Sequence, residues 1–168
     1  MDILFVIFFL LISVILVYLS IFDIKYKEIP FIPCLIGLGI SAFFVILNTL
    51  LGSPSANIPT FQDALIGFIL LAGLIWIIVF ITKERGMGEG DIFLFGIMGI
   101  SLGLSNLFTG FLVCVYSATI YGLILSVIKR KFHGLQIPLV PFISVGIILT
   151  LIFHPNLFQI FNRLIGLT

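Results

Sequence analysis

Six apolar segments dominate the sequence and decide what it can fold into. A membrane-spanning helix needs about 20 consecutive, mostly apolar residues, and all of the segments except residues 92–108 have about that length. We count residues 92–108 as a span as well, with a re-entrant segment as the alternative. The prediction is an all-α integral membrane protein, a six-transmembrane-helix bundle in a single domain over residues 1–168. The predicted helices cover residues 3–22, 31–51, 64–82, 92–108, 110–128 and 139–158.

The composition fits a chain that lies in lipid rather than a soluble domain. Hydrophobic residues make up 61% of the 168 residues, charged residues only 9%, and the mean hydropathy is +1.38, values that soluble domains do not reach. The net charge of +1 and the lack of a long basic tract predict the lipid bilayer, and no nucleic acid, as a partner. Because the connections are short, any active site must be built from helix ends and short loops.

Lysine and arginine set the expected orientation, because they accumulate in cytoplasmic loops. With six spans, seven of the eight basic residues fall on one face. Both termini are therefore predicted to lie outside the cytoplasm, in a cytoplasmic or inner membrane. If residues 92–108 did not cross, the last basic cluster would change sides, which favours six spans. The seven residues are Lys25, Lys27, Lys83, Arg85, Lys129, Arg130 and Lys131, and Arg163 lies on the other face.

A glycine-rich segment, Gly86-Met87-Gly88-Glu89-Gly90-Asp91, joins the third and fourth predicted helices and ends in a carboxylate. An acid at the threshold of a membrane helix is costly unless it is solvated, paired or functional, which makes Asp91 a candidate site residue. The glycines give a backbone that another part of the chain can approach closely. A flexible interfacial loop with an ordinary solvated acid is the alternative.

A second acid, Asp23, ends the first predicted helix. Two crossings separate it from Asp91, so the topology predicts both acids at the cytoplasmic face although they are 68 positions apart. Two carboxyl groups held close together do not both ionise readily, so one keeps a proton. Aspartyl proteolysis requires such a pair, because the charged group takes a proton from water while the neutral one polarises the scissile carbonyl. Asp91, at a helix N-terminus, is expected to be charged, and Asp23, at a helix C-terminus, to hold the proton.

Other chemistries find little support in the sequence. Cys34 and Cys114 lie inside apolar segments without a CxxC pair, so we expect both to pack within the bundle, and we predict no metal and no cofactor. Serine catalysis would need a His within reach of a Ser. His133 and His154 fall on opposite faces in the predicted topology, and no GxSxG motif occurs.

With these residues assembled, the sequence resembles the type IV prepilin peptidases, membrane aspartyl peptidases of the GxGD kind. The segment Gly88-Glu89-Gly90-Asp91 matches their second catalytic motif, and Asp23 followed by Ile29-Pro30 matches their first. The segment Ile137-Pro138-Leu139-Val140-Pro141-Phe142 resembles the proline-rich start of their last helix.

This resemblance implies an enzyme that cuts the short basic leader from prepilin-like precursors (pilins, pseudopilins or archaellins) at the cytoplasmic face. Asp23 and Asp91 would form its catalytic pair, and Gly88, Glu89 and Gly90 its active-site loop. Two departures stand out. Phe93 occupies a position where the family often carries Lys, and only residues 24–30 replace the cysteine-containing insertion that larger members use for N-methylation. We therefore expect a short form without methyltransferase activity.

Acids near the pair would attract a basic leader. Glu28, Glu84 and Glu89 are candidates, with solvated loop charge as the alternative reading of each. A rival function from another class is a small cation or proton transporter that uses the same two acids, although these lie at one face rather than at the midplane. A non-catalytic scaffold with the peptidase architecture is the third alternative.

Overall fold

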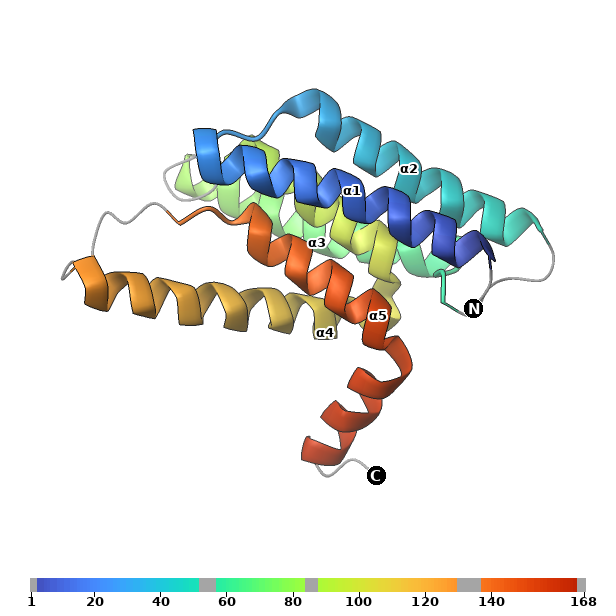
Figure 1. Ribbon diagram of the computed structural model, residues 1–168. Coiled ribbons are helices and arrows are strands. Elements are labelled where there is room, and N and C mark those ends of the chain that lie inside the picture. Colours follow the sequence, from blue (N-terminus) through green and yellow to red (C-terminus); the bar gives the residue numbers. More distant parts are fainter. Residues whose placement is uncertain (1–2, 52–56, 84–87, 130–136, 166–168) are drawn as a thin grey trace.

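The computed structural model is all-helical over the residues that it describes, 3–51, 57–83, 88–129 and 137–165, with side chains described as far as Phe153. The helices form a single bundle in which consecutive helices run in alternating directions (Figure 1). The bounds of the helices are α1 Ile3–Tyr26, α2 Phe31–Leu50, α3 Phe61–Thr82, α4 Glu89–Lys129 and α5 Val140–Ile165.

Helix α4 folds back on itself at Gly103. The backbone there has φ 62° and ψ 176°, which is not helical and which residues with a side chain rarely adopt. In a straight helix, residues 95 and 111 would lie about 24 Å apart, yet the ring centroids of Phe95 and Phe111 are 6.2 Å apart. The two halves of α4 therefore run in opposite directions, and both ends of α4 lie at the same end of the bundle (Figure 1).

The predicted segments 92–108 and 110–128 are thus the two halves of α4, and their boundary differs from the prediction. The chain reverses at Gly103, whereas residues 104–110 are helical. The φ of 62° with ψ of 176° at this turn is a backbone conformation that is essentially restricted to glycine. The other helices differ from the predicted spans mainly at their ends. Helix α1 runs four residues further, to Tyr26, and α3 starts three residues earlier, at Phe61. Helix α5 starts at Val140 and ends at Ile165, seven residues beyond the predicted end at residue 158. By length and composition, α1, α2, α3 and α4 are each able to cross a membrane, and Val140–Phe153 is a shorter apolar helix.

The first half of α4 forms the centre of the bundle. Almost every residue from Leu94 to Gly103 is buried, and α2, α3 and α5 all pack against α4 while α1 packs against α2 and α5. Helices α3 and α4 cross at two glycines, since a Cβ on either Gly67 or Gly99 would lie 2.5 Å from the other's carbonyl oxygen. Such contacts between small residues let helices approach closely in lipid.

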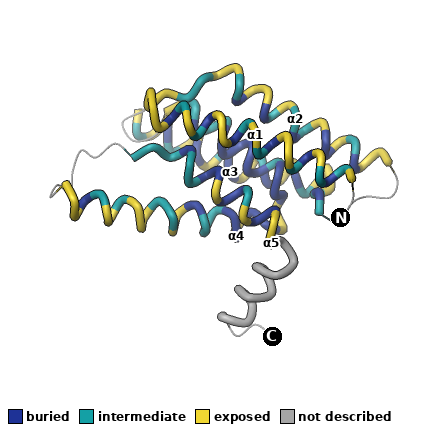
Figure 2. Tube along the Cα trace, in the orientation of Figure 1, coloured by how far each residue is buried: buried dark blue, intermediate teal, exposed yellow. Residues whose placement is uncertain are grey.

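Large apolar side chains fill the interior of the bundle and also cover its outer surface. Figure 2 shows the exposed residues on the outward faces of α1 and α2 and along the second half of α4, and most of them are apolar. A soluble protein of this size does not expose so much apolar surface. The chain is therefore a membrane protein of the all-α class.

Candidate active site

Asp91 lies in the first turn of α4 and caps that helix. Its Oδ2 accepts a hydrogen bond of 3.0 Å from the backbone N–H of Gly88, the residue just before the helix. This is half of a capping box, in which a side chain in the first turn satisfies a backbone donor that the helix leaves free. The glycine-rich motif thus holds its own carboxyl group, which is buried with 7% of its surface exposed.

Asp23 lies in the last turn of α1 and is held by a different helix. Lys27, with φ 55°, closes α1 by donating its backbone N–H to the Asp23 carbonyl at 2.8 Å. The Asp23 side chain turns inward, and its Oδ2 accepts a hydrogen bond of 3.0 Å from the backbone N–H of Val140, the first residue of α5. A carboxylate at this position satisfies a free donor of α5. Asp23 is 6% exposed, so both acids are buried.

The fold brings the two acids together at one end of the bundle. The carboxyl groups of Asp23 and Asp91 are close enough for the charge of one to affect the other, and the buried thiol of Cys34 in α2 lies near Asp91. We call this end the carboxylate end: it is where α1 and α3 finish and where α2, α4 and α5 begin (Figure 1). Two buried carboxyl groups that share a site can divide the tasks of acid and base between them.

The segment that follows Asp23 and the glycine-rich segment that precedes Asp91 are in direct contact. Gly90 packs against Ile29, and a Cβ added to Gly90 would lie 2.7 Å from the Ile29 Cβ and 3.1 Å from its Cδ1. At Gly88, in contrast, no described residue lies within 4 Å of the place where a Cβ would be. Gly90 therefore allows the segment between α1 and α2 to approach the start of α4 closely. This contact holds the start of α4 against the end of α1.

Comparison with known proteins identifies the family. The profile described as the type IV leader peptidase family matches residues 10–127. The chain belongs to the type IV leader peptidase family. The match covers more than half of the chain and includes both acids, and membership implies a protease that processes prepilin-like precursors. Comparison with curated proteins and with solved structures gives no significant match.

Around the acids of this leader peptidase, the remaining predicted site residues differ in their surroundings. Glu28 and Glu89 are exposed at the carboxylate end, and Glu84 lies outside the described residues. Phe93, which stands where a lysine was expected from the resemblance, is half-buried and makes an edge contact of 5.2 Å with the ring of Phe31. Cys34 and Cys114 are both buried. Among the described residues, no three His, Cys, Asp or Glu side chains form a group able to hold a metal ion.

The sequence interpretation missed the partner of Asp23. We argued that Asp23 holds the proton because it ends a helix, but its carboxyl group also receives the N–H of Val140 at the start of α5. Each acid thus accepts a backbone N–H at the start of a helix. The position at a helix terminus therefore does not show which of the two acids holds the proton. A signal was present: no Ser, Thr, Asp or Asn precedes Val140 in Ile137-Pro138-Leu139, so α5 needs a capping group from another segment.

Proposed function

We propose that this protein is an aspartyl endopeptidase that removes the short basic leader from prepilin-like precursors, with Asp23 and Asp91 as its catalytic pair. One observation carries the proposal: in a chain of the leader peptidase family, two buried carboxyl groups from different helices share one end of the bundle. The precursors would be pilins, pseudopilins or archaellins, whose apolar segment stays in the membrane after cleavage.

The chemistry needs one proton shared between the two acids. The ionised carboxylate takes a proton from a water molecule, whose oxygen attacks the carbonyl carbon of the scissile bond. The protonated carboxyl group donates a hydrogen bond to the carbonyl oxygen and stabilises the charge that develops there. When the C–N bond breaks, the leaving amine takes up a proton from the pair. Gly88 and Gly90 hold Asp91 in place through the hydrogen bond and the close contact described above.

The proposal includes six spans, with both termini outside the cytoplasm and the carboxylate end facing it. The reversal within α4 supports six spans, because its halves form an antiparallel pair. The bias of basic residues toward this end supports the orientation. Labelling of single introduced cysteines in intact cells and in inverted vesicles tests it. Cysteines at Glu28 and Glu89 should react from the cytoplasmic side, and labelling from outside would contradict the orientation.

Methyl transfer is absent from the proposed activity. The segment between α1 and α2 consists of residues 27–30 alone, which leaves no room there for the cysteine-containing insertion of the larger members. Glu28 and Glu89, exposed at the carboxylate end, are the proposed contacts for the basic leader, together with Glu84. The expected product is therefore a precursor without its leader and with an unmodified new N-terminus, which mass spectrometry of the product tests directly.

The experiment for the proposed function is co-expression of the full chain with a prepilin-like precursor, followed by mass analysis of the precursor. Cleavage at the junction of the leader and the apolar segment is expected, and it should disappear with Asp23→Asn or Asp91→Asn. Cleavage that survives either substitution would contradict the role of the pair. If the native chain cleaves no precursor but carries cations across a liposome membrane, the transporter is the better description.

A further inference from the structure

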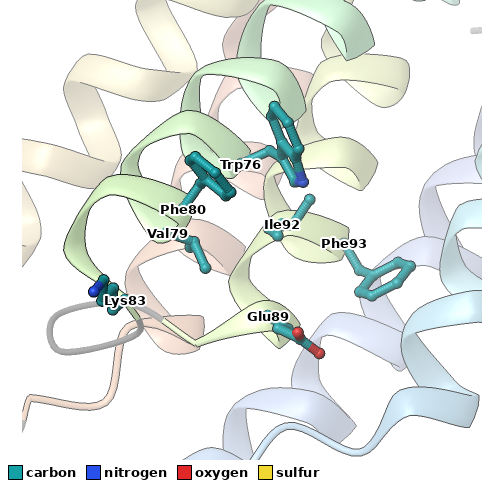
Figure 3. Close-up of a pocket in the computed structure, with 7 residues that line it drawn as sticks. All are labelled: Trp76, Val79, Phe80, Lys83, Glu89, Ile92 and Phe93. Atoms are coloured by element: carbon teal, nitrogen blue, oxygen red, sulfur yellow. The ribbon is translucent and has the colours of Figure 1, made fainter.

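A groove of about 620 Å³ lies between α3 and α4 at the carboxylate end. Figure 3 shows Trp76 and Phe80 of α3 along one side and Ile92 and Phe93 of α4 along the other. Lys83 follows the end of α3, and Glu89 is the first residue of α4. These two residues are charged, and the other residues that line the groove are apolar. We propose that this groove binds the apolar helix of the substrate precursor, next to its cleavage site; the proposal rests on the proposed function.

The groove exists because of how three helices are arranged. Helices α2 and α3 both pack against α4 but hardly touch each other, which leaves a channel along the surface of α4. Phe93 bounds the channel on the α2 side, where its ring meets Phe31 edge-on at 5.2 Å. Trp76 and Phe80, whose rings stack at 5.7 Å, bound it on the α3 side. Both are more than half exposed, so a helix in the membrane has lateral access to the groove.

The position of the groove fits a segment that must reach the two acids. Glu89, Ile92 and Phe93 are spaced i, i+3 and i+4, so they share one face of α4, whereas Asp91 points to the other face of the same turn and into the bundle. An α-helix is about 10 Å across, and about three extended residues cover that distance. The precursor chain that precedes the docked helix can therefore pass over the first turn of α4 in an extended conformation. The peptide bond that reaches the acids would lie about three residues N-terminal to the docked helix.

The charges at the rim favour one direction of docking. The N-terminal end of a helix carries partial positive charge, and the leader that precedes it is basic under the proposed function. Glu89, exposed at the carboxylate end of the groove, attracts both. Lys83 lies on the α3 side, where its long stem can carry the ammonium group to the headgroup region. A precursor helix with its N-terminus at the carboxylate end is thus complementary to the groove in apolarity and in charge.

Site-specific photocross-linking tests the occupant. A photoreactive phenylalanine analogue replaces Phe80 in the full chain with Asp23→Asn, in membranes that contain a precursor made of a basic leader and an apolar helix of about 20 residues. The matched control carries the analogue at Phe43, which is 58% exposed on α2 and does not line the groove. We expect an adduct at position 80 that maps to the precursor's apolar segment, and at least about tenfold less at position 43. Equal adducts at both positions, adducts with lipid only, or adducts with a second copy of this chain would overturn the proposal.

Kinetics give a second readout that does not depend on cross-linking. Trp76→Lys places an ammonium group in the apolar wall on α3, and we expect the KM for leader cleavage to rise about tenfold with a smaller change in kcat. Trp76→Leu, which keeps the wall apolar, should raise KM much less. An unchanged KM in a folded Trp76→Lys chain would contradict the proposal. If the native chain cleaves the precursor but these results fail, only the groove proposal is lost; if the native chain does not cleave it, the proposed function fails as well.

Discussion

Replacing Gly90 by alanine tests the contact on which the position of Asp91 depends. The new Cβ would lie 2.7 Å from the Ile29 Cβ, whereas carbon atoms in contact normally lie about 3.5–4.0 Å apart. The start of α4 and the segment after α1 must therefore separate by about 1 Å, and Asp91, the next residue, moves with them. A displacement of about 1 Å at a catalytic group lowers the rate about 100-fold. The cost in folding free energy should be about 1–3 kcal/mol, as for other overpacked sites.

The assay is leader cleavage by purified protein in detergent, with kcat normalised to the folded fraction. Gly88→Ala is the matched control, because it adds the same methyl group two residues earlier, where no atom of the residues that the structure describes lies within 4 Å, and it should lose far less activity. Adding Ile29→Gly to Gly90→Ala removes the opposing atoms and should restore part of the lost rate. If Gly90→Ala is no worse than Gly88→Ala, or if Ile29→Gly restores nothing, the steric account of the motif is refuted.

Three further substitutions test other parts of the structure. Val140→Pro removes the N–H from which Asp23 accepts a hydrogen bond of 3.0 Å, and proline is tolerated at the first residue of a helix. We expect kcat to fall about tenfold or more relative to Val140→Ala, and equal rates would contradict a role for this donor. Gly103→Ala forces a side chain onto φ 62° and should cost about 1–3 kcal/mol, seen as a lower Tm in detergent, and an unchanged Tm would mean that α4 does not turn there. Ser41→Ala removes the buried hydroxyl contact of 3.0 Å with Ser101 and should lower the stability by about 1 kcal/mol; no loss would show that the contact does not stabilise the bundle.

Much of the architecture could be predicted from the sequence because lipid imposes simple rules. Apolar segments of sufficient length predict helices, and alternation of the crossings predicts that Asp23 and Asp91 share one end of the bundle, where the structure has them. Gly99 and Gly103 are four residues apart, a spacing of small residues that is typical of close helix packing in lipid, and Gly99 does meet Gly67 at the crossing of α3 and α4. These are local or topological features, which the order of residues encodes directly.

The rest depends on contacts between distant residues, which no local pattern encodes. The hydrogen bond from Val140 to Asp23 joins residues 117 positions apart, and the contact of Gly90 with Ile29 depends on how the start of α4 meets the segment between α1 and α2. The predicted helix over residues 92–108 runs through the turn at Gly103, because Gly96, Gly99 and Gly103 are all compatible with a packed helix. Only the folded structure shows that Gly103 has a positive φ. The groove beside Phe93 is likewise a product of how α2 and α3 pack on α4.

Single-turnover cleavage of a leader-bearing precursor by four chains tests the catalytic pair most directly: the native protein, Asp23→Asn, Asp91→Asn and the double variant. Two groups that act as one catalytic unit are strongly non-additive, so removal of either costs about as much as removal of both. The account predicts that each single variant falls to the same residual rate as the double variant, with all four chains folded. A single variant that cleaves measurably faster than the double variant would contradict it.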